Sequence, residues 1–132
     1  MKMKPTLVFV YGSLRKGMGN HSVLNPRGSM LVDEYTTPPE YHLADLGYYP
    51  AVLKGGGTAI KGELYAVSQE VWEAVEYLEG YPSFYDRVEL TTPHGVAIMY
   101  YLPHDLCRPE DNDLVESGDW VEYYENQSRL VG

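Results

Sequence analysis

Residues 68–80 read Ser68-Gln69-Glu70-Val71-Trp72-Glu73-Ala74-Val75-Glu76-Tyr77-Leu78-Glu79-Gly80. Ser68 is a favoured N-cap residue, because its side-chain oxygen can accept a hydrogen bond from the first helical turn. Gly80 can take the left-handed conformation that commonly ends a helix. The pattern therefore predicts a helix over residues 69–79. Wound at about 100° per residue, its apolar arc contains Val71, Trp72, Ala74, Val75 and Leu78. The opposite side contains Gln69, Glu70, Glu73, Glu76 and Tyr77.

Glu79 is the exception on this helix, because the same winding places it inside the apolar arc, between Val75 and Trp72. A carboxylate on a core-facing stripe costs several kcal/mol unless it is paired, neutralised or facing a cavity. Apolar neighbours, the negative end of the helix and the nearby Glu76 would all raise its pKa. We therefore predict that Glu79 is a general acid and base that works near neutral pH. The alternative is a fraying helix end at which Glu79 is solvated.

The rest of the chain is rich in predicted strands. Before the helix, apolar and alternating stretches predict strands at residues 7–11, 30–35, 41–44, 51–53 and 59–67, with a short helix at 20–24. After it, residues 85–92 and 96–102 flank Pro93-His94-Gly95 and predict a hairpin, followed by a loop at 108–113. Residues 115–124 have a pattern that cannot be assigned to either a helix or a strand. This order predicts an α+β fold in one domain over residues 1–132, with a small closed or partly closed β-barrel.

Composition narrows the classes of partner. The chain has 132 residues, 44% of them hydrophobic, and a net charge of -9. This charge argues against nucleic acid and against anionic membrane surfaces as partners. No apolar run reaches membrane-spanning length, so we expect no membrane segment. Cys107 is the only cysteine, which is typical of a reducing compartment and leads us to expect a cytoplasmic protein. Much of the excess acid lies between Glu110 and Glu125, and some of it could belong to a solvated tail.

The turn after the first predicted strand is the first candidate site. Tyr11-Gly12-Ser13-Leu14 contains a glycine that lets backbone N–H groups converge. Such a turn can hold an anion such as a carboxylate, and Ser13 could add a hydroxyl donor. The alternative is a purely structural turn.

The chain that follows Glu79 forms the second candidate site. Gly80 and Pro82 end the helix sharply. Tyr85 and Arg87 then point to the same face of the next strand, where they could line a pocket beside Glu79. The alternative for Arg87 is an ion pair with an acid of the helix.

The sequence predicts neither a metal site nor a covalent nucleophile. His21, His42, His94 and His104 are scattered, and none stands at ligand spacing with another histidine or with a cysteine. No phosphate loop or dinucleotide fingerprint is present, and we expect no cofactor.

The two candidate sites together carry a family resemblance. Residues 8–17, Val8-Phe9-Val10-Tyr11-Gly12-Ser13-Leu14-Arg15-Lys16-Gly17, followed by Asn20-His21, resemble the opening motif of the gamma-glutamylcyclotransferase-like family. Residues 74–82 with 85–87 resemble its second motif, and Gly118-Asp119-Trp120 resembles a late motif of its smaller members. The likeness is strongest to the short gamma-glutamylamine cyclotransferase branch. The family usually has Leu-Asp where this chain has Val75-Glu76, which places a longer acid beside the site.

This resemblance implies a small mixed β-barrel flanked by helices and a small-molecule γ-glutamyl substrate. The substrate would bind at Tyr11, Gly12, Ser13 and Leu14, with Glu79 as the catalytic acid and base. In the family reaction the α-amine of a γ-glutamyl group attacks its own γ-carbonyl, closes 5-oxoproline and expels an amine. The nucleophile belongs to the substrate, so no serine, cysteine or metal is required.

Two other functions fit the same residues. A binding module would hold an amino-acid-like ligand without converting it. An amide hydrolase would use Glu79 to activate water and would release free glutamate. Neither the amine attached to the γ-glutamyl group nor the oligomeric state follows from the sequence.

Overall fold

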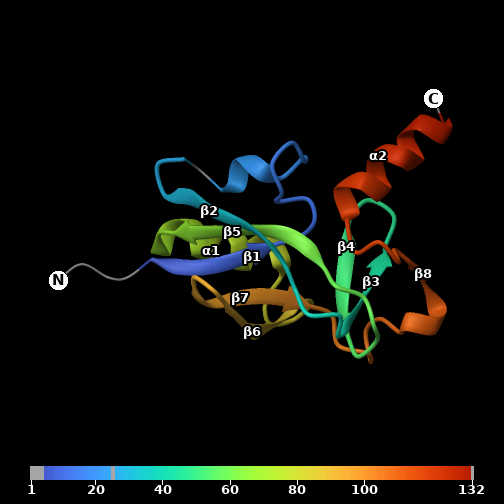
Figure 1. Ribbon diagram of the computed structural model, residues 1–132. Helices are drawn as coiled ribbons and strands as arrows, with labels where there is room; N and C mark the ends of the chain where they lie inside the picture. Colours follow the sequence, from blue (N-terminus) through green and yellow to red (C-terminus); the bar gives the residue numbers. More distant parts are fainter. Residues whose placement is uncertain (1–4, 25, 132) are drawn as a thin grey trace.

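A computed structural model gives the fold, and it describes residues 5–24 and 26–131 (Figure 1). The larger sheet has the order β2-β5-β1-β7-β6. Its strands are β1 (Thr6–Val10), β2 (Ser29–Thr36), β5 (Lys61–Val67), β6 (Asp86–Thr92) and β7 (Gly95–Tyr101). β1 runs parallel to β7, whereas its pairing with β5 is antiparallel, so the sheet is mixed. The predicted hairpin is confirmed as β6 and β7, joined at Pro93-His94.

A smaller sheet with the order β4-β3-β8 lies beside the larger one (Figure 1). Its strands are β3 (Tyr41–Asp45), β4 (Pro50–Lys54) and β8 (Asp113–Leu114). The two sheets are joined where Leu102 N–H donates to the Val52 carbonyl at 3.0 Å. The α+β class with helices beside a mixed sheet is confirmed. Among the described strands, the ladders leave β2 and β6 as edges of the larger sheet and do not form one closed ring.

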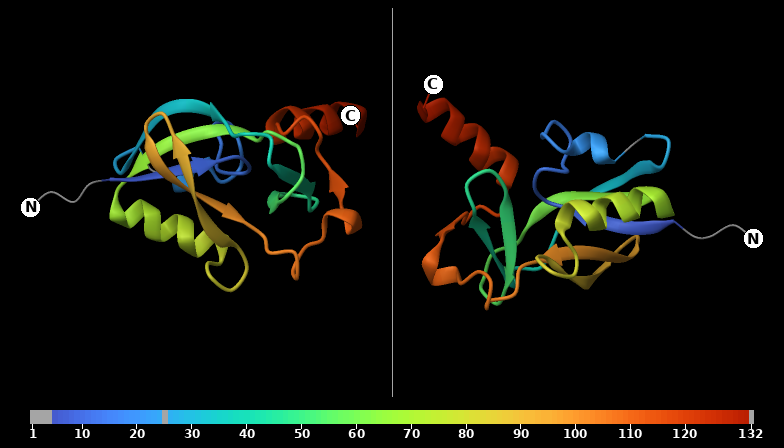
Figure 2. Two further views of the ribbon diagram at one scale, coloured as in Figure 1. Left: turned by 60° about the horizontal axis from the view of Figure 1, so that its bottom comes forward. Right: turned by 180° about the vertical axis from the view of Figure 1, so that it is seen from behind.

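Two α-helices flank these sheets, far from one another in every view (Figure 2). Helix α1 (Gln69–Glu79) covers one face of the larger sheet, and α2 (Trp120–Val131) begins beside the smaller one. Two short 3₁₀ helices, η1 (His21–Val23) and η2 (Pro109–Asp111), lie in the connections. The expected short helix at 20–24 is therefore confirmed. The acidic stretch at 110–125, part of which was expected to be a solvated tail, contains β8 and the start of α2, whose first residue Trp120 is buried.

Helix α1 has the predicted ends. The Ser68 side chain accepts a hydrogen bond from Val71 N–H at 3.3 Å, and Gly80 is left-handed with φ 66°. The buried face is centred on Val71 and Val75, which pack against β1 and β5 in the core. The predicted apolar arc was too wide, because Ala74 and Leu78 on one side of it are both exposed.

Strand β1 lies at the centre of the core. Val8 and Val10 belong to a cluster beneath α1, while Phe9 belongs to a second cluster that reaches Trp120. β1 is thus buried on both faces, as a continuous apolar run predicts. Over residues 5–24 and 26–131, no helix has the length and apolar character needed to span a membrane.

Candidate active site

All of the predicted site residues except Arg87 line one cavity of about 420 Å³. Its walls are the turn after β1 at residues 11–14, the β3–β4 hairpin at 48–50, the end of α1 and the segment that follows α1. Glu79 lines this cavity together with Tyr11, Gly12, Ser13, Leu14 and Tyr85. A chain that reverses after β1 and a helix that ends at Gly80 therefore bring the two candidate sites to one hollow.

Glu79 is half-buried in the wall of this cavity. Burial raises the pKa of its carboxyl from 4.5 to about 7. In the part of the chain that the structure describes, no hydrogen bond or ion pair involves this carboxylate. Glu76, expected to repel it, forms an ion pair with Arg87 instead. A desolvated carboxyl without a partner can accept and return a proton near neutral pH.

Three tyrosines surround Glu79 without donating to it. The Tyr11 hydroxyl donates to the Tyr100 carbonyl at 2.7 Å, and the Tyr85 hydroxyl donates to the Pro50 carbonyl at 2.8 Å. The Tyr100 hydroxyl donates to Glu76 and accepts from Trp72 Nε1. Burial is the main reason that the pKa of all three phenols is raised, and Glu79 adds a repulsive contribution to each. Because these protons are committed elsewhere, they do not stabilise the ionised carboxylate of Glu79.

The turn at 11–14 packs closely against β4. A Cβ on Gly12 would lie 2.7 Å from Cγ of Pro50, so only glycine lets the turn approach this wall. Ser13 Oγ accepts a hydrogen bond from Asn20 Nδ2 at 3.0 Å, which leaves its hydroxyl proton to donate elsewhere. Within residues 5–24, the turn and loop hydrogen bonds do not use the N–H groups of Ser13 or Leu14 as donors. These groups can receive an anionic atom of a ligand.

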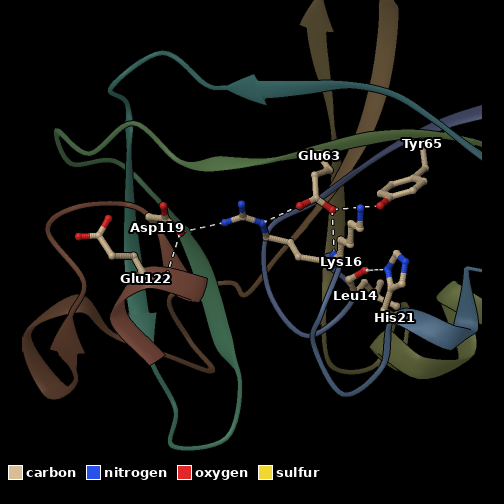
Figure 3. A network of polar contacts seen from close by, with 8 residues as sticks. Leu14, Lys16, His21, Glu63, Tyr65, Asp119 and Glu122 are labelled. Atoms are coloured by element: carbon tan, nitrogen blue, oxygen red, sulfur yellow. Dashed lines mark hydrogen bonds and ion pairs between the residues drawn. The ribbon is translucent and has the colours of Figure 1, made fainter. Parts of the chain in front are cut away.

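A polar network fixes the far side of the same turn (Figure 3). Arg15 pairs with Glu63 on β5 at 3.1 Å and with Asp119 at 2.9 Å. Glu63 also accepts from Lys16 N–H and from the Tyr65 hydroxyl, each at 3.0 Å. The side chains of Arg15, Glu63 and Asp119 are 14%, 9% and 18% exposed, so solvent screens these pairs weakly.

Asp119 connects this network to α2. Its Oδ1 accepts from Glu122 N–H at 3.2 Å and thereby caps the helix (Figure 3). The segment Gly118-Asp119-Trp120 thus ties α2 to the turn that lines the cavity.

Arg87 is not among the residues that line the cavity. Its guanidinium pairs with Glu76 and lies 4.3 Å from the ring centroid of Tyr81. The alternative considered from the sequence, a pair with an acid of the helix, is therefore what the structure contains. The partner is Glu76, which the helical winding had assigned to the solvent side.

Several residues of the cavity wall were not predicted. Asn20, Tyr48, Tyr49, Phe84 and Tyr100 all line it. Tyr48-Tyr49-Pro50 carried a signal, since paired aromatics in a short turn are unusual in a solvated loop. No feature of the sequence indicated that Tyr100 would line the cavity, because its position depends on the pairing of β7 with other strands.

Among the described residues, no group of three or more histidine, cysteine, aspartate or glutamate side chains is arranged to hold a metal ion. Cys107 is buried, and its thiol accepts a hydrogen bond from Asn112.

Comparison with known proteins gives consistent matches. The family model described as "Gamma-glutamyl cyclotransferase, AIG2-like" matches residues 8–122. A Vibrio cholerae protein, provisionally named a gamma-glutamylcyclotransferase, is 39% identical over 118 residues, which are 88% of this chain and 96% of that protein. The gamma-glutamylcyclotransferase family protein YtfP of Escherichia coli K12 is 36% identical over 119 residues, 87% of this chain and 96% of that protein.

The solved structures that match have the same fold. An uncharacterised protein from Pyrococcus horikoshii superposes with a TM-score of 0.77 at 28% identity, covering 94% of this chain and 97% of that one. The solution structure of ytfP from Escherichia coli gives a TM-score of 0.69 at 32% identity, covering 89% of this chain and 98% of that one.

Proposed function

Because the chain belongs to the gamma-glutamyl cyclotransferase, AIG2-like family, we propose that it converts a γ-glutamyl amine or amide to 5-oxoproline and a free amine. One observation carries this proposal. Glu79, with a pKa raised to about 7, lines the same cavity as the turn at 11–14. That juxtaposition supports a role for Glu79 as the proton carrier and for the turn as the source of hydrogen-bond donors.

The proposed reaction begins with a proton transfer. The Glu79 carboxylate takes a proton from the substrate's α-ammonium group, which frees the nitrogen lone pair. That nitrogen attacks the γ-carbonyl carbon, a new C–N bond closes the five-membered ring, and the carbonyl electrons move onto oxygen.

The tetrahedral intermediate then collapses. The protonated Glu79 gives its proton to the departing nitrogen, the original amide C–N bond breaks, and the carbonyl of 5-oxoproline re-forms. The ring nitrogen, which still carries two hydrogens after the attack, passes one of them to the released amine, which leaves as an ammonium ion, and Glu79 is again a carboxylate. The net reaction consumes no water. A carboxyl with a pKa near neutrality suits both transfers, because neither its acid nor its base form is strongly disfavoured at pH 7.

The turn at 11–14 would hold the negative charge of the substrate. The N–H groups of Ser13 and Leu14 and the Ser13 hydroxyl would donate to the α-carboxylate or to the developing oxyanion, and the position of this turn in the cavity wall supports this assignment. Tyr11 and Tyr85 would act as walls, since their hydroxyl protons are engaged by backbone carbonyls. We assign Arg87 to the support of Glu76 and Tyr100, and not to contact with the substrate.

The proposal is tested by identifying the products that the protein releases. The purified protein is incubated with a panel of γ-glutamyl amines, and the products are separated by liquid chromatography with mass spectrometry. We expect 5-oxoproline and the free amine in equal amounts. Free glutamate would instead establish a hydrolase, and calorimetric binding without any product would establish a binding module.

A further inference from the structure

Four large apolar side chains surround the mouth of the cavity. Tyr48, Tyr49, Leu78 and Phe84 are 88%, 40%, 40% and 40% exposed, and all four line the cavity. We call these four residues the collar. Exposed apolar side chains that gather around one cavity are typical of a ligand-binding groove.

The collar is held by ordered backbone on both sides. In the β3–β4 hairpin, Leu46 N–H donates to the Tyr49 carbonyl at 3.0 Å and Gly47 N–H donates to Asp45 at 2.7 Å. Gly47 has a φ of 104°, which glycine adopts without strain. These bonds present Tyr48 and Tyr49 at the tip of the hairpin.

The other half of the collar is fixed by the end of α1. Phe84 N–H donates to the Gly80 carbonyl at 2.8 Å, and the Phe84 ring meets Tyr85 edge-on with centroids 5.0 Å apart. Leu78 immediately precedes Glu79 on the helix. The collar therefore lies next to the proposed proton carrier in sequence and around the same cavity in space.

The proposed reaction fixes which half of the substrate meets the collar. The γ-glutamyl group must lie between Glu79 and the turn at 11–14, because its α-amine and γ-carbonyl react there. The leaving amine then extends toward the mouth. We propose, on the basis of the function proposed above, that the collar binds the leaving amine and selects amines that carry an apolar ring.

The charges around the cavity favour this choice. Of the described residues that line it, Glu79 is the only carboxylate and none is a lysine or an arginine. An amine that carries a carboxylate, such as glycine, would therefore find no cation at the mouth and would meet a chain of net charge -9. An apolar ring would instead cover side chains that now face water, with the ring geometry that aromatic pairs favour.

The experiment compares kcat/KM for three substrates: the γ-glutamyl amides of benzylamine, ethylamine and glycine. We expect the benzyl compound to exceed the ethyl compound by about tenfold and the glycine compound to be the poorest. A fourth substrate, the γ-glutamyl amide of putrescine, tests the faces of the tyrosines as a cation site. Equal values for benzyl and ethyl, or a preference for glycine or putrescine, would overturn the proposal.

Two tyrosines of equal exposure provide a matched pair of variants. Tyr48 is 88% exposed and lines the cavity, whereas Tyr77 on α1 is 90% exposed and does not. Tyr48→Ala is expected to lower the benzyl-to-ethyl ratio roughly threefold to tenfold, while Tyr77→Ala leaves it unchanged. An unchanged ratio in Tyr48→Ala and in the companion variant Phe84→Ala would refute the collar as the determinant.

Binding without turnover gives an independent readout. In Glu79→Gln, calorimetry measures the dissociation constants of the benzyl and ethyl compounds, and we expect the same order as in kcat/KM. Absence of 5-oxoproline from every substrate would be a failure of the proposed function. Production of 5-oxoproline without selectivity for the ring would be a failure of the collar alone.

Discussion

The phenol of Tyr11 donates a hydrogen bond to the main-chain carbonyl of Tyr100 at 2.7 Å and accepts one from Val52 N–H at 3.2 Å. One hydroxyl thereby joins the end of β1 to β7 and β4 beneath the cavity. It also directs its proton away from Glu79, so the carboxyl that the site depends on keeps a raised pKa.

Tyr11→Phe tests this junction. The change leaves a buried backbone carbonyl and a buried N–H group without their partner, and we expect a loss of about 1–3 kcal/mol in the free energy of unfolding. Urea denaturation measures the loss. Tyr35→Phe is the control, because the Tyr35 hydroxyl donates to Thr91 in an exposed position, and should change stability by less than about 0.5 kcal/mol. Equal effects of the two changes would contradict the role assigned to Tyr11.

The pH dependence of the reaction should report Glu79. With the carboxylate as the base, kcat/KM should fall about tenfold for each pH unit below about 7 and level off above it. A ¹³C titration of the Glu79 carboxyl by NMR should give the same midpoint. A midpoint near the ordinary value of 4.5 in both measurements would show that burial does not tune this group.

Stability should depend on pH in the opposite direction. The pKa of Glu79 is higher in the folded state than in the unfolded one. The stabilisation that this carboxyl gives to the folded state is therefore complete below about pH 4.5 and is lost as the pH rises through about 7. Glu79→Gln removes this ionisation and should be more stable than the unmodified protein by up to about 3 kcal/mol at pH 8. The difference should vanish near pH 4, as thermal unfolding at a series of pH values will show. A variant that is less stable at pH 8 would contradict the burial of this charge.

The pair between Arg15 and Glu63 should act on substrate binding through the turn. Glu63→Gln weakens the hold of β5 on Arg15 and on Lys16 N–H, so we expect a rise in KM of roughly tenfold with a smaller change in kcat. The free energy of unfolding should fall by about 3 kcal/mol. The control is Asp33→Asn, which removes an exposed pair with His94 and should affect neither quantity measurably. A fall in stability with KM unchanged would restrict the pair to a structural role.

The local chemistry of the chain made much of this fold predictable. Ser68 and Gly80 set the ends of α1, because capping depends on the residue and its immediate neighbours. The continuous apolar run at 7–11 predicted a central strand, and β1 is buried on both faces. The position of Glu79 beside a cavity was predictable, because a charged group on the apolar stripe of a helix is costly unless it is paired, neutralised or facing a cavity.

Other features depend on contacts that no local pattern encodes. Helix α2 follows a segment of mixed pattern and is anchored by the Tyr123 hydroxyl on Asp45, 78 residues earlier in the chain. Glu76 was assigned to solvent by the helical period, but Arg87 and Tyr100 from the following hairpin cover it. Glu63 lies in a strand whose pattern is otherwise apolar, so nothing in the sequence singled it out. Its ion pair is with Arg15, which belongs to a turn far away in the sequence.

Quantifying 5-oxoproline released by the unmodified protein and by Glu79→Gln tests the central claim most directly. Glutamine keeps the size of the side chain but cannot carry the proton, and circular dichroism confirms that the variant is folded. We predict a loss of about 10²–10⁴-fold in kcat, with the γ-glutamyl amine still bound. Release of 5-oxoproline by Glu79→Gln at the unmodified rate would contradict the assignment of Glu79 as the proton carrier.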